Sequence, residues 1–417
     1  MRFLLLCCLL SSLAFGQTTH TIKEITVTGN TRTKTALLKK LINLELGTVV
    51  DSTKLANTAA RLIRLPGIAH AYFTVEEKSN GAKIVYTVEE QHTLIPFANV
   101  YSSDNEDLAF RLGLQEFNFA GQMMTVGGFY QYDVFHSYGL QFRAPYLFSS
   151  QWGLEVNYQD LTTQEPVFLA NGTADYKYNN RSIEVLGLYA PSYKHNFALG
   201  LSSFQEDYAY LFGSTDPNVP QELKVDKWLV KLLYTYDNIN YFYYYLDGFK
   251  SSLNLQYVQS NDGNLLPFWL GFNDFTYYKR IGKRGNFATR LRLGLAKNIA
   301  SPFAPFAVDN NLNIRGVGNT IDRGTGSVVL NAEYRFTLLD RNWLVLQGNA
   351  FIDSGSWRNP GGTFDDFIQS ENLRIYPGIG IRVMHKKIFN AIFRIDYGHG
   401  ITPDSSKGFV FGIGQYF

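Results

Sequence analysis

The stretch 327-SVVLNAEYRFTLL-339 alternates between apolar and polar side chains with a period of two. That period indicates a β-strand with two different faces. One face carries apolar side chains, including two aromatic rings: Val328, Leu330, Ala332, Tyr334 and Phe336. The other face carries an amide and two opposite charges: Asn331, Glu333 and Arg335. A strand in a soluble sandwich also alternates, but an aromatic-topped apolar face opposite charged residues favours a strand between lipid and a wet interior.

The same period recurs through the chain from about residue 94. It is clear in 251-SSLNLQYVQ-259, 286-NFATRLRLGLAK-297 and 389-FNAIFRIDYGHG-400. Sixteen strands are predicted, at 94–103, 108–116, 122–132, 138–146, 152–161, 181–190, 195–207, 225–236, 249–259, 271–280, 286–296, 327–338, 343–352, 374–385, 389–398 and 407–417. An even number is expected for a single-chain barrel, whose closure pairs every backbone group inside a membrane. The sequence therefore predicts an all-β transmembrane barrel of sixteen antiparallel strands over residues 94–417, with room for extra strand in 162–180.

The composition of the chain favours the same class. Aromatic residues make up 15% of the chain and charged residues only 18%. Beyond the N-terminal segment, no stretch approaches the roughly 18 consecutive apolar residues of a membrane-spanning helix. The formal net charge is +2, which implies no nucleic acid or other polyanionic partner.

The predicted connections between strands alternate in length. Short turns follow even-numbered strands, at 281-IGKRG-285, 339-LDRN-342 and 385-HKKI-388. Long polar loops follow several odd-numbered strands, at 208–224, 297–326 and 353–373. Short turns are typical of the periplasmic end of a barrel and long loops of its outer end. This parity places the segment 311–326 in the outer loop between the eleventh and twelfth predicted strands.

The N-terminal residues 1–16 are predicted to be a signal peptide. Arg2 precedes a short apolar run, and Ala14-Phe15-Gly16 supplies the small residues of a cleavage site. Both cysteines of the chain, Cys7 and Cys8, lie in that run, and Leu6 is too large for a lipid-anchor site. We therefore expect an exported protein without a disulfide framework.

Residues 20–92 have a different pattern from the rest of the chain. Alternation in 22-IKEITVTGN-30 predicts a strand, and apolar residues four apart predict helices within 33–44 and 51–67. Two alternating segments around Asn80-Gly81 predict a hairpin. The order β-α-α-β-β describes a small α+β domain, which either accepts an extended peptide at its exposed sheet edge or is a structural or docking domain; both interpretations stay open.

The loop 311-NLNIRGVGNTIDRGTG-326 carries an arginine among glycines that exclude regular structure. By strand parity, Phe351, Asp353 and Glu333 face the barrel lumen. A loop folded inward could place Arg315 against both acids, with Phe351 stacked on its guanidinium group, and the planar fork favours arginine over lysine there. The alternative is an ordinary solvated arginine beside unrelated lumenal acids.

The last predicted strand, 407-KGFVFGIGQYF-417, places Phe409, Phe411, Ile413 and Phe417 on its apolar face. Gly412 and Gly414 weaken the strand where it must pair with the first one. They either loosen this seam or relieve barrel curvature, and both interpretations stay open.

These motifs resemble two known families. The N-terminal region resembles a POTRA domain in its Gly29-Asn30, Gly47, Pro66-Gly67 and Val88-Glu89-Glu90. The remainder resembles the BamA/TamA superfamily of outer-membrane assembly and transport proteins. The matching positions are Ile314, Arg315, Gly316 and Val317 in the sixth outer loop, Glu333 on strand twelve, and 351-FIDSG-355, which ends in Gly355. Val317 departs from the aromatic residue usual at its position. Terminal aromatic strands, here ending at Phe417, resemble the assembly signal of such barrels.

The resemblance implies a function and a location. It implies an outer-membrane barrel of a Gram-negative bacterium, with its POTRA domain in the periplasm and a strand 1/strand 16 seam that opens sideways to accept client strands. Expected partners are client polypeptides, outer-membrane lipid, and periplasmic chaperones or accessory lipoproteins. A single POTRA domain favours an accessory, specialised or lipid-handling member. The alternative class is a passive porin-like or structural barrel plugged by its loop.

No catalytic motif is found in the sequence. The seven histidines form no H-E-x-x-H pattern, and neither a G-x-S-x-G elbow nor a phosphate-binding loop occurs. Lumenal acids such as Asp396 could imitate a catalytic carboxylate, but neighbouring arginines favour ion pairing. We expect no enzyme activity, no metal and no cofactor.

Overall fold

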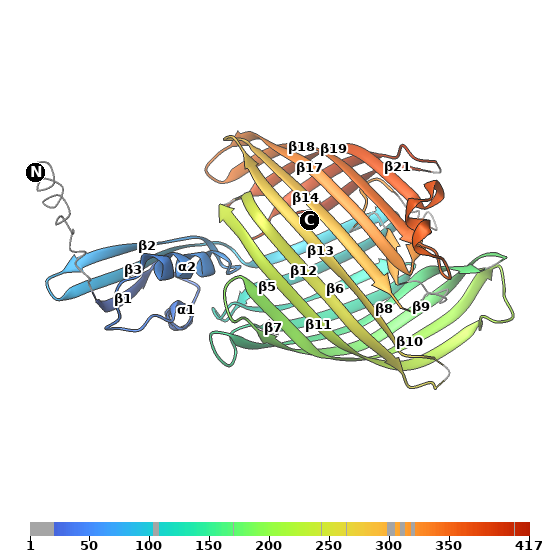
Figure 1. The fold of residues 1–417 in the computed structure, drawn as a ribbon, viewed down its shortest axis with the longest axis horizontal. Coiled ribbons are helices and arrows are strands. Elements are labelled where there is room, and N and C mark those ends of the chain that lie inside the picture. The colour runs from blue at the N-terminus through green and yellow to red at the C-terminus, as the bar shows by residue number, and fades with distance from the viewer. Residues whose placement is uncertain are drawn as a thin grey trace, which may run out of the picture.

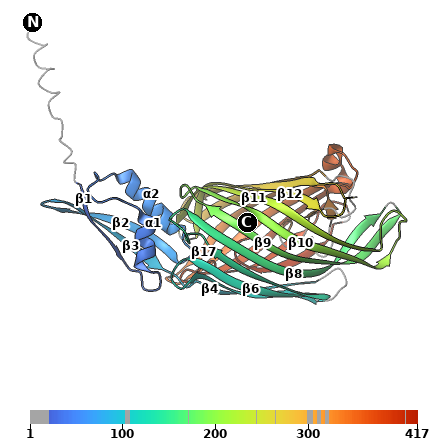
Figure 2. The ribbon, with the colours of Figure 1, turned by 90° about the horizontal axis from the view of Figure 1, so that it is seen from below.

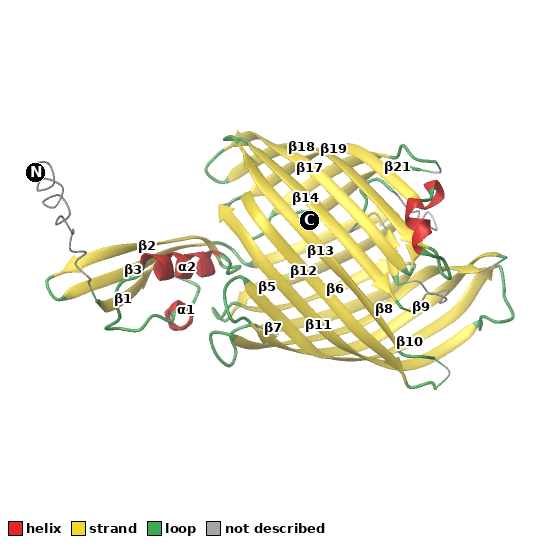
Figure 3. Cartoon of the chain, in the orientation of Figure 1, coloured by secondary structure: helices red, strands yellow, loops and turns green. Residues whose placement is uncertain are grey.

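The computed structural model describes residues 21–102, 108–169, 171–242, 244–263, 265–297, 305–308, 313–317, 322–403 and 405–417. The predicted signal peptide lies outside the described residues. A small α+β domain is followed by a large β-barrel, and the two lie end to end (Figures 1 and 3). No helix in the described part of the chain is long and apolar enough to cross a membrane.

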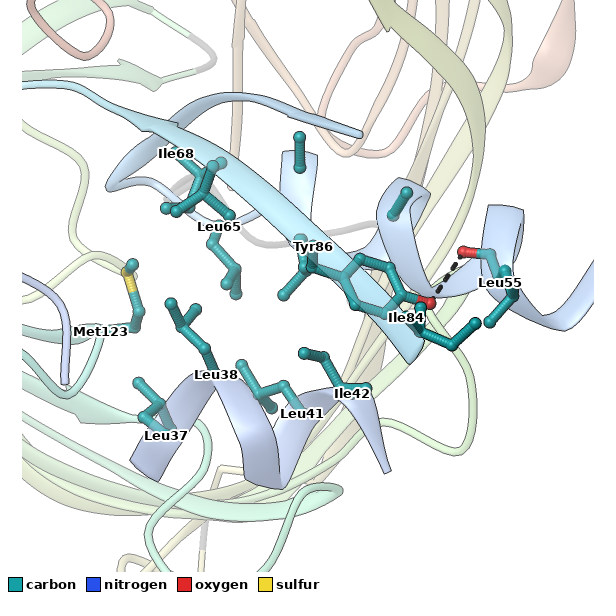
Figure 4. Packing of buried hydrophobic residues seen from close by; sticks show 14 of the residues in the cluster. Leu37, Leu38, Leu41, Ile42, Leu55, Leu65, Ile68, Ile84, Tyr86 and Met123 are labelled. Atoms are coloured by element: carbon teal, nitrogen blue, oxygen red, sulfur yellow. Dashed lines mark hydrogen bonds between the residues drawn. The ribbon is translucent and has the colours of Figure 1, made fainter. Parts of the chain in front are cut away.

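The N-terminal domain has the predicted order of elements. These are β1 (Ile22–Thr28), α1 (Thr35–Ile42), α2 (Ser52–Ile63), β2 (Ile68–Lys78) and β3 (Gly81–Glu90). The sheet order is β1-β3-β2, with β1 parallel and β2 antiparallel to β3. Asp51 caps α2 by accepting hydrogen bonds from the backbone N–H groups of Thr53 and Lys54. Both helices pack apolar stripes against the inner face of β3, around the buried Tyr86 (Figure 4).

The barrel is a single antiparallel sheet of sixteen strands, which confirms the predicted fold class. Its strands are β4 (Leu94–Ser102), β5 (Leu108–Phe119), β6 (Met124–Asp133), β7 (Phe135–Ala144), β8 (Trp152–Leu169), β9 (Gly172–Tyr189), β10 (His195–Gly213), β11 (Glu222–Phe242), β12 (Tyr245–Ser260), β13 (Phe268–Ile281), β14 (Gly285–Ala296), β17 (Gly326–Asp340), β18 (Leu344–Arg358), β19 (Leu373–His385), β20 (Ile392–His399) and β21 (Lys407–Ile413). Two short strands, β15 (Phe306–Val308) and β16 (Asp322–Gly324), pair within the long loop between β14 and β17.

Two segments predicted as loops contain regular structure, and 162–180, which left room for extra strand, does contain it. Strands β8 and β9 pair as far as Leu169 and Gly172, so 162–180 is a hairpin. The predicted loop 208–224 is mostly strand of β10 and β11. In 353–373, β18 continues to Arg358, and two 3-10 helices follow, η1 (Phe364–Ile368) and η2 (Ser370–Asn372). The two hairpins extend because their inner faces pack together: Val167, Tyr176 and Tyr208 form a buried cluster there.

The outward and inward faces of the barrel differ as the alternation predicts. Large apolar side chains are exposed on the outer face, for example Leu201 at 59% and Ile379 at 66%. Their neighbours on the inner face are polar and buried, for example Ser202 and Arg382. An apolar exterior around a polar interior is the arrangement of a barrel that spans a lipid bilayer.

The N-terminal domain is fixed to the end of the barrel that carries the short turns (Figure 2). Met123, in the β5–β6 turn, is part of the hydrophobic core of the domain. Lys40 donates to the carbonyl oxygen of Tyr146 at 2.8 Å in the β7–β8 turn. Arg64 donates to the carbonyl oxygen of Ile239 at 2.7 Å near the end of β11. The domain therefore contacts successive turns of the barrel in one orientation.

Candidate functional site

Arg315 lies inside the barrel, fully buried, against both predicted acids. Its Nε and Nη2 atoms donate to the two carboxylate oxygens of Asp353 at 2.8 and 2.9 Å. Its Nη1 atom donates to Glu333 at 2.7 Å. Its backbone N–H also donates to Asp353, at 3.0 Å. This bidentate geometry uses the planar fork of the guanidinium group, which an ammonium group cannot reproduce.

An aromatic ring lies over the same guanidinium group. The Cζ atom of Arg315 is 3.6 Å from the centroid of the Phe351 ring. That ring in turn covers Gly378 of β19, where an added Cβ atom would be 2.2 Å from it. Gly378 therefore provides the space in which Phe351 lies flat beneath the arginine.

Further arginines surround these acids in the lumen. Arg335 and Arg382 also donate to Glu333, the latter at 2.7 Å. Asp396 lies 3.7 Å from Arg315 and accepts from Arg394 at 3.3 Å. We call the following eight buried residues the arginine cluster: Arg290, Arg315, Arg335, Arg382, Arg394, Glu333, Asp353 and Asp396. Five cations and three anions leave it with two excess positive charges among these described side chains.

Two glycines bring the loop against the barrel wall. Gly316 has a φ of +93°, a conformation that favours glycine. An added Cβ atom on Gly316 would be 2.6 Å from the Cα atom of Gly398 on β20. A Cβ atom on Gly398 would be 2.1 Å from the carbonyl oxygen of Arg315. The close approach of these two backbones holds the loop at the depth of the acids.

The residues beside Arg315 pack into an apolar cluster. Ile314 and Val317 are fully buried with Val308, Trp357 and Tyr376. Gly355 faces this cluster, and a Cβ atom there would be 2.8 Å from Ile314. Val317 therefore packs in an apolar site whose aromatic rings, Trp357 and Tyr376, come from the barrel wall.

The ends of the barrel sheet, β4 and β21, form the seam. Among the described residues, no strand ladder joins them, although every other neighbouring pair of barrel strands is hydrogen-bonded. Next to the seam, His92 forms an isolated parallel bridge with Ile388 of the β19–β20 turn. Phe409 and Phe411 of β21 point outward and are 62% and 51% exposed. On the inner side of β21, Gly412 leaves space for the guanidinium group of Arg394, because an added Cβ atom would be 2.5 Å from one of its nitrogens.

The final predicted strand is wrong in its last four residues. Strand β21 ends at Ile413, and Gly414 has a φ of +94°, which turns the chain out of the sheet. Tyr416 is only 5% exposed, and Phe417 packs near Tyr278 and Ala288 inside the barrel. Phe417 is therefore not on the outer apolar face. The arginines of the lumen attract these two rings inward.

The other side of the lumen is open. A cavity of about 1210 Å³ lies along strands β5 to β13 and reaches the outer loops. Its walls carry amides, such as Gln141 and Asn157, and ion pairs, such as Lys231 with Glu184. In the described ranges, no group of three or more histidine, cysteine or acidic residues could hold a metal ion.

The sequence patterns did not identify several of these residues as part of the site. Arg382, Gly378, Gly398 and Tyr416 each contact the predicted site from another strand or from beyond β21. Parity alone puts Arg382 in the lumen, so a search for every inward arginine could have found it. No sequence signal pairs Gly398 with Gly316.

Known proteins share this architecture. The POTRA family model, described as a surface antigen variable number repeat, matches residues 20–91. No curated protein sequence matches the chain. The crystal structure of BamA from Haemophilus ducreyi lacking POTRA domains 1–3 is 15% identical, with a TM-score of 0.58, covering 95% of this chain and 84% of that one.

Two structures of CdiB are also similar. The protein from Acinetobacter baumannii is 14% identical with a TM-score of 0.60, covering 95% of this chain and 74% of that chain. The protein from Escherichia coli is 12% identical with a TM-score of 0.56, covering 97% and 91%. The POTRA domain and the BamA-type barrel expected from the motifs are thus both present, and the likeness to these structures is one of fold.

Proposed function

We propose that this chain, which has the POTRA domain and sixteen-stranded barrel of the BamA/TamA superfamily, inserts or translocates other polypeptides at an outer membrane. The observation that supports this proposal is the seam between β4 and β21. A barrel that lacks a ladder between β4 and β21 has two strand edges with backbone groups available to pair with an incoming strand. The process requires strand exchange and no covalent chemistry.

The POTRA domain supplies a second edge for an extended client. Strand β2 is at the edge of its sheet, and its second half is exposed, including Val75 at 40%. Because the domain is fixed to the short-turn end of the barrel, a peptide added to β2 is delivered to that end. We assign this end to the periplasm of a Gram-negative cell and the long hairpins to the exterior.

A passive barrel is the second candidate. The arginine cluster and the inward loop fill one side of the lumen, as a structural plug would. A lipid-handling role is the third candidate, since the open side holds a cavity of about 1210 Å³.

Depletion of the protein in its own cells separates these functions. Outer-membrane barrel proteins and surface lipids are quantified after depletion, with re-expression of the intact chain as control. A fall in barrel proteins or in exported polypeptides is expected. A fall in surface lipids alone would support lipid handling, and normal levels of all of them would leave only the passive barrel.

A further inference from the structure

The four residues after β21 enter the same site as the loop motif. We call residues 414–417 the lumenal tail. Gly414 turns the chain inward, and the side-chain oxygen of Gln415 accepts a hydrogen bond from Arg382 at 2.7 Å. A main-chain oxygen of Phe417 accepts one from Arg335 at 3.4 Å. The tail is therefore bound through two arginines that also bind Glu333.

Tyr416 reaches the loop arginine itself. Its ring centroid is 4.7 Å from the Cζ atom of Arg315 and 4.8 Å from that of Arg394. Phe351 contacts the guanidinium group of Arg315 as well, at 3.6 Å. Among the described residues, Arg315 thus has two aromatic partners, one from the barrel wall and one from the residues that follow the seam strand β21.

The charge of the cluster favours this arrangement. The eight residues of the cluster include two more cations than acids, and the electron-rich faces of aromatic rings attract cations where water is excluded. Tyr416 is 5% exposed. An aromatic tail inside the lumen is therefore bound by the same charges that hold the loop.

We propose that Tyr416 is a positioning residue for Arg315 and that the lumenal tail couples the seam strand to the loop motif. Movement of β21 away from β4 withdraws Tyr416 from Arg315, and release of the loop frees the tail. The coupling must be equal in both directions. This coupling rests on the proposed function only for its biological purpose, which is to link the opening of the seam to the position of the inward loop.

Cysteine labelling in lipid vesicles tests the first direction without any client. The only cysteines, Cys7 and Cys8, lie in the predicted signal peptide, so Val317→Cys in the fully buried loop motif gives a single reporter in the processed chain. Tyr416→Leu removes the ring and should raise the labelling rate roughly thirtyfold, the equilibrium effect of one desolvated cation–π contact. Tyr416→Phe keeps the ring and should stay within about twofold of the unmodified tail.

The control is Tyr277→Leu, which removes a tyrosine from the outer face of β13 and should leave labelling unchanged. Equal rates for Tyr416→Leu and Tyr416→Phe, whether both high or both low, overturn the positioning role. If Tyr416→Leu does not assemble, Tyr416→Met takes its place, because it is also apolar and lacks a ring.

The reverse direction uses a reporter in the tail. Asp353→Asn weakens the hold on the loop, and it should raise the labelling rate of Phe417→Cys several-fold. An unchanged rate, in a variant whose loop reporter shows release, overturns the coupling. Because no client is present, this result is independent of whether the barrel assembles other proteins.

Discussion

Replacement of Arg315 by alanine should release the loop from the lumen. The change removes two hydrogen bonds to Asp353 and one to Glu333. Glu333 keeps Arg335 and Arg382, so its charge stays compensated. Asp353 is fully buried, and among the hydrogen bonds of the described residues it keeps the one from the backbone N–H of residue 315. The cost of stranding one buried charge is about 3–5 kcal/mol, and we expect the lower end because only one of the two acids is stranded.

The assay is the labelling of Val317→Cys by a membrane-impermeant maleimide. About 3 kcal/mol in the opening equilibrium corresponds to a labelling rate roughly a hundredfold faster. In an Asp353→Asn background, the same change should add less than about threefold, because the charge that it would strand is gone. A rate within threefold of the parent protein for Arg315→Ala alone would refute the view that these ion pairs hold the loop.

Three further changes have distinct expected results. Gly398→Ala should speed labelling of the loop reporter more than tenfold, because a Cβ atom lies 2.1 Å from the carbonyl oxygen of Arg315, whereas Gly408→Ala, with its nearest contact at 3.6 Å, should have little effect. Burial alone raises the pKa of Glu90, but hydrogen bonds from Thr33 and the backbone of the β1–α1 connection outweigh it and lower this pKa from 4.5 to about 2. The carboxylate therefore stabilises the N-terminal domain fully above about pH 4.5, and this contribution is lost as the pH falls towards 2; urea unfolding of Glu90→Gln should lack that pH dependence. Arg64→Ala should loosen the domain from the barrel by about 1–2 kcal/mol, measured as faster proteolysis of the connection after β3.

The period of two in the sequence was sufficient for the barrel, because lipid and lumen impose opposite polarity on alternate residues. The same parity placed Glu333, Phe351 and Asp353 on the inner face. The period of two did not predict how far the outer hairpins extend. There the inner face is apolar and aromatic, as in Tyr176 and Tyr208, and lies beyond the region that the membrane pattern describes.

The end of the chain could not be predicted from its pattern. Phe409, Phe411, Ile413 and Phe417 fit a continuing strand, and only the backbone conformation of Gly414 separates them. The attraction that draws Tyr416 inward comes from arginines on several other strands. Such contacts depend on the assembled barrel, so they have no signature in the local sequence.

A reversible lock across the seam tests the proposed mechanism most directly. To join β4 to β21, one cysteine is introduced within 95–98 and a second within 409–413. The control is the double variant Tyr334→Cys and Ala350→Cys, whose two positions are paired in the β17–β18 ladder. Insertion of outer-membrane barrel proteins into vesicles is then measured before and after reduction. We predict that oxidation of the seam pair stops insertion, that reduction restores it, and that the control pair has no effect. Equal insertion by the oxidised and reduced seam variants would contradict a seam that opens to clients.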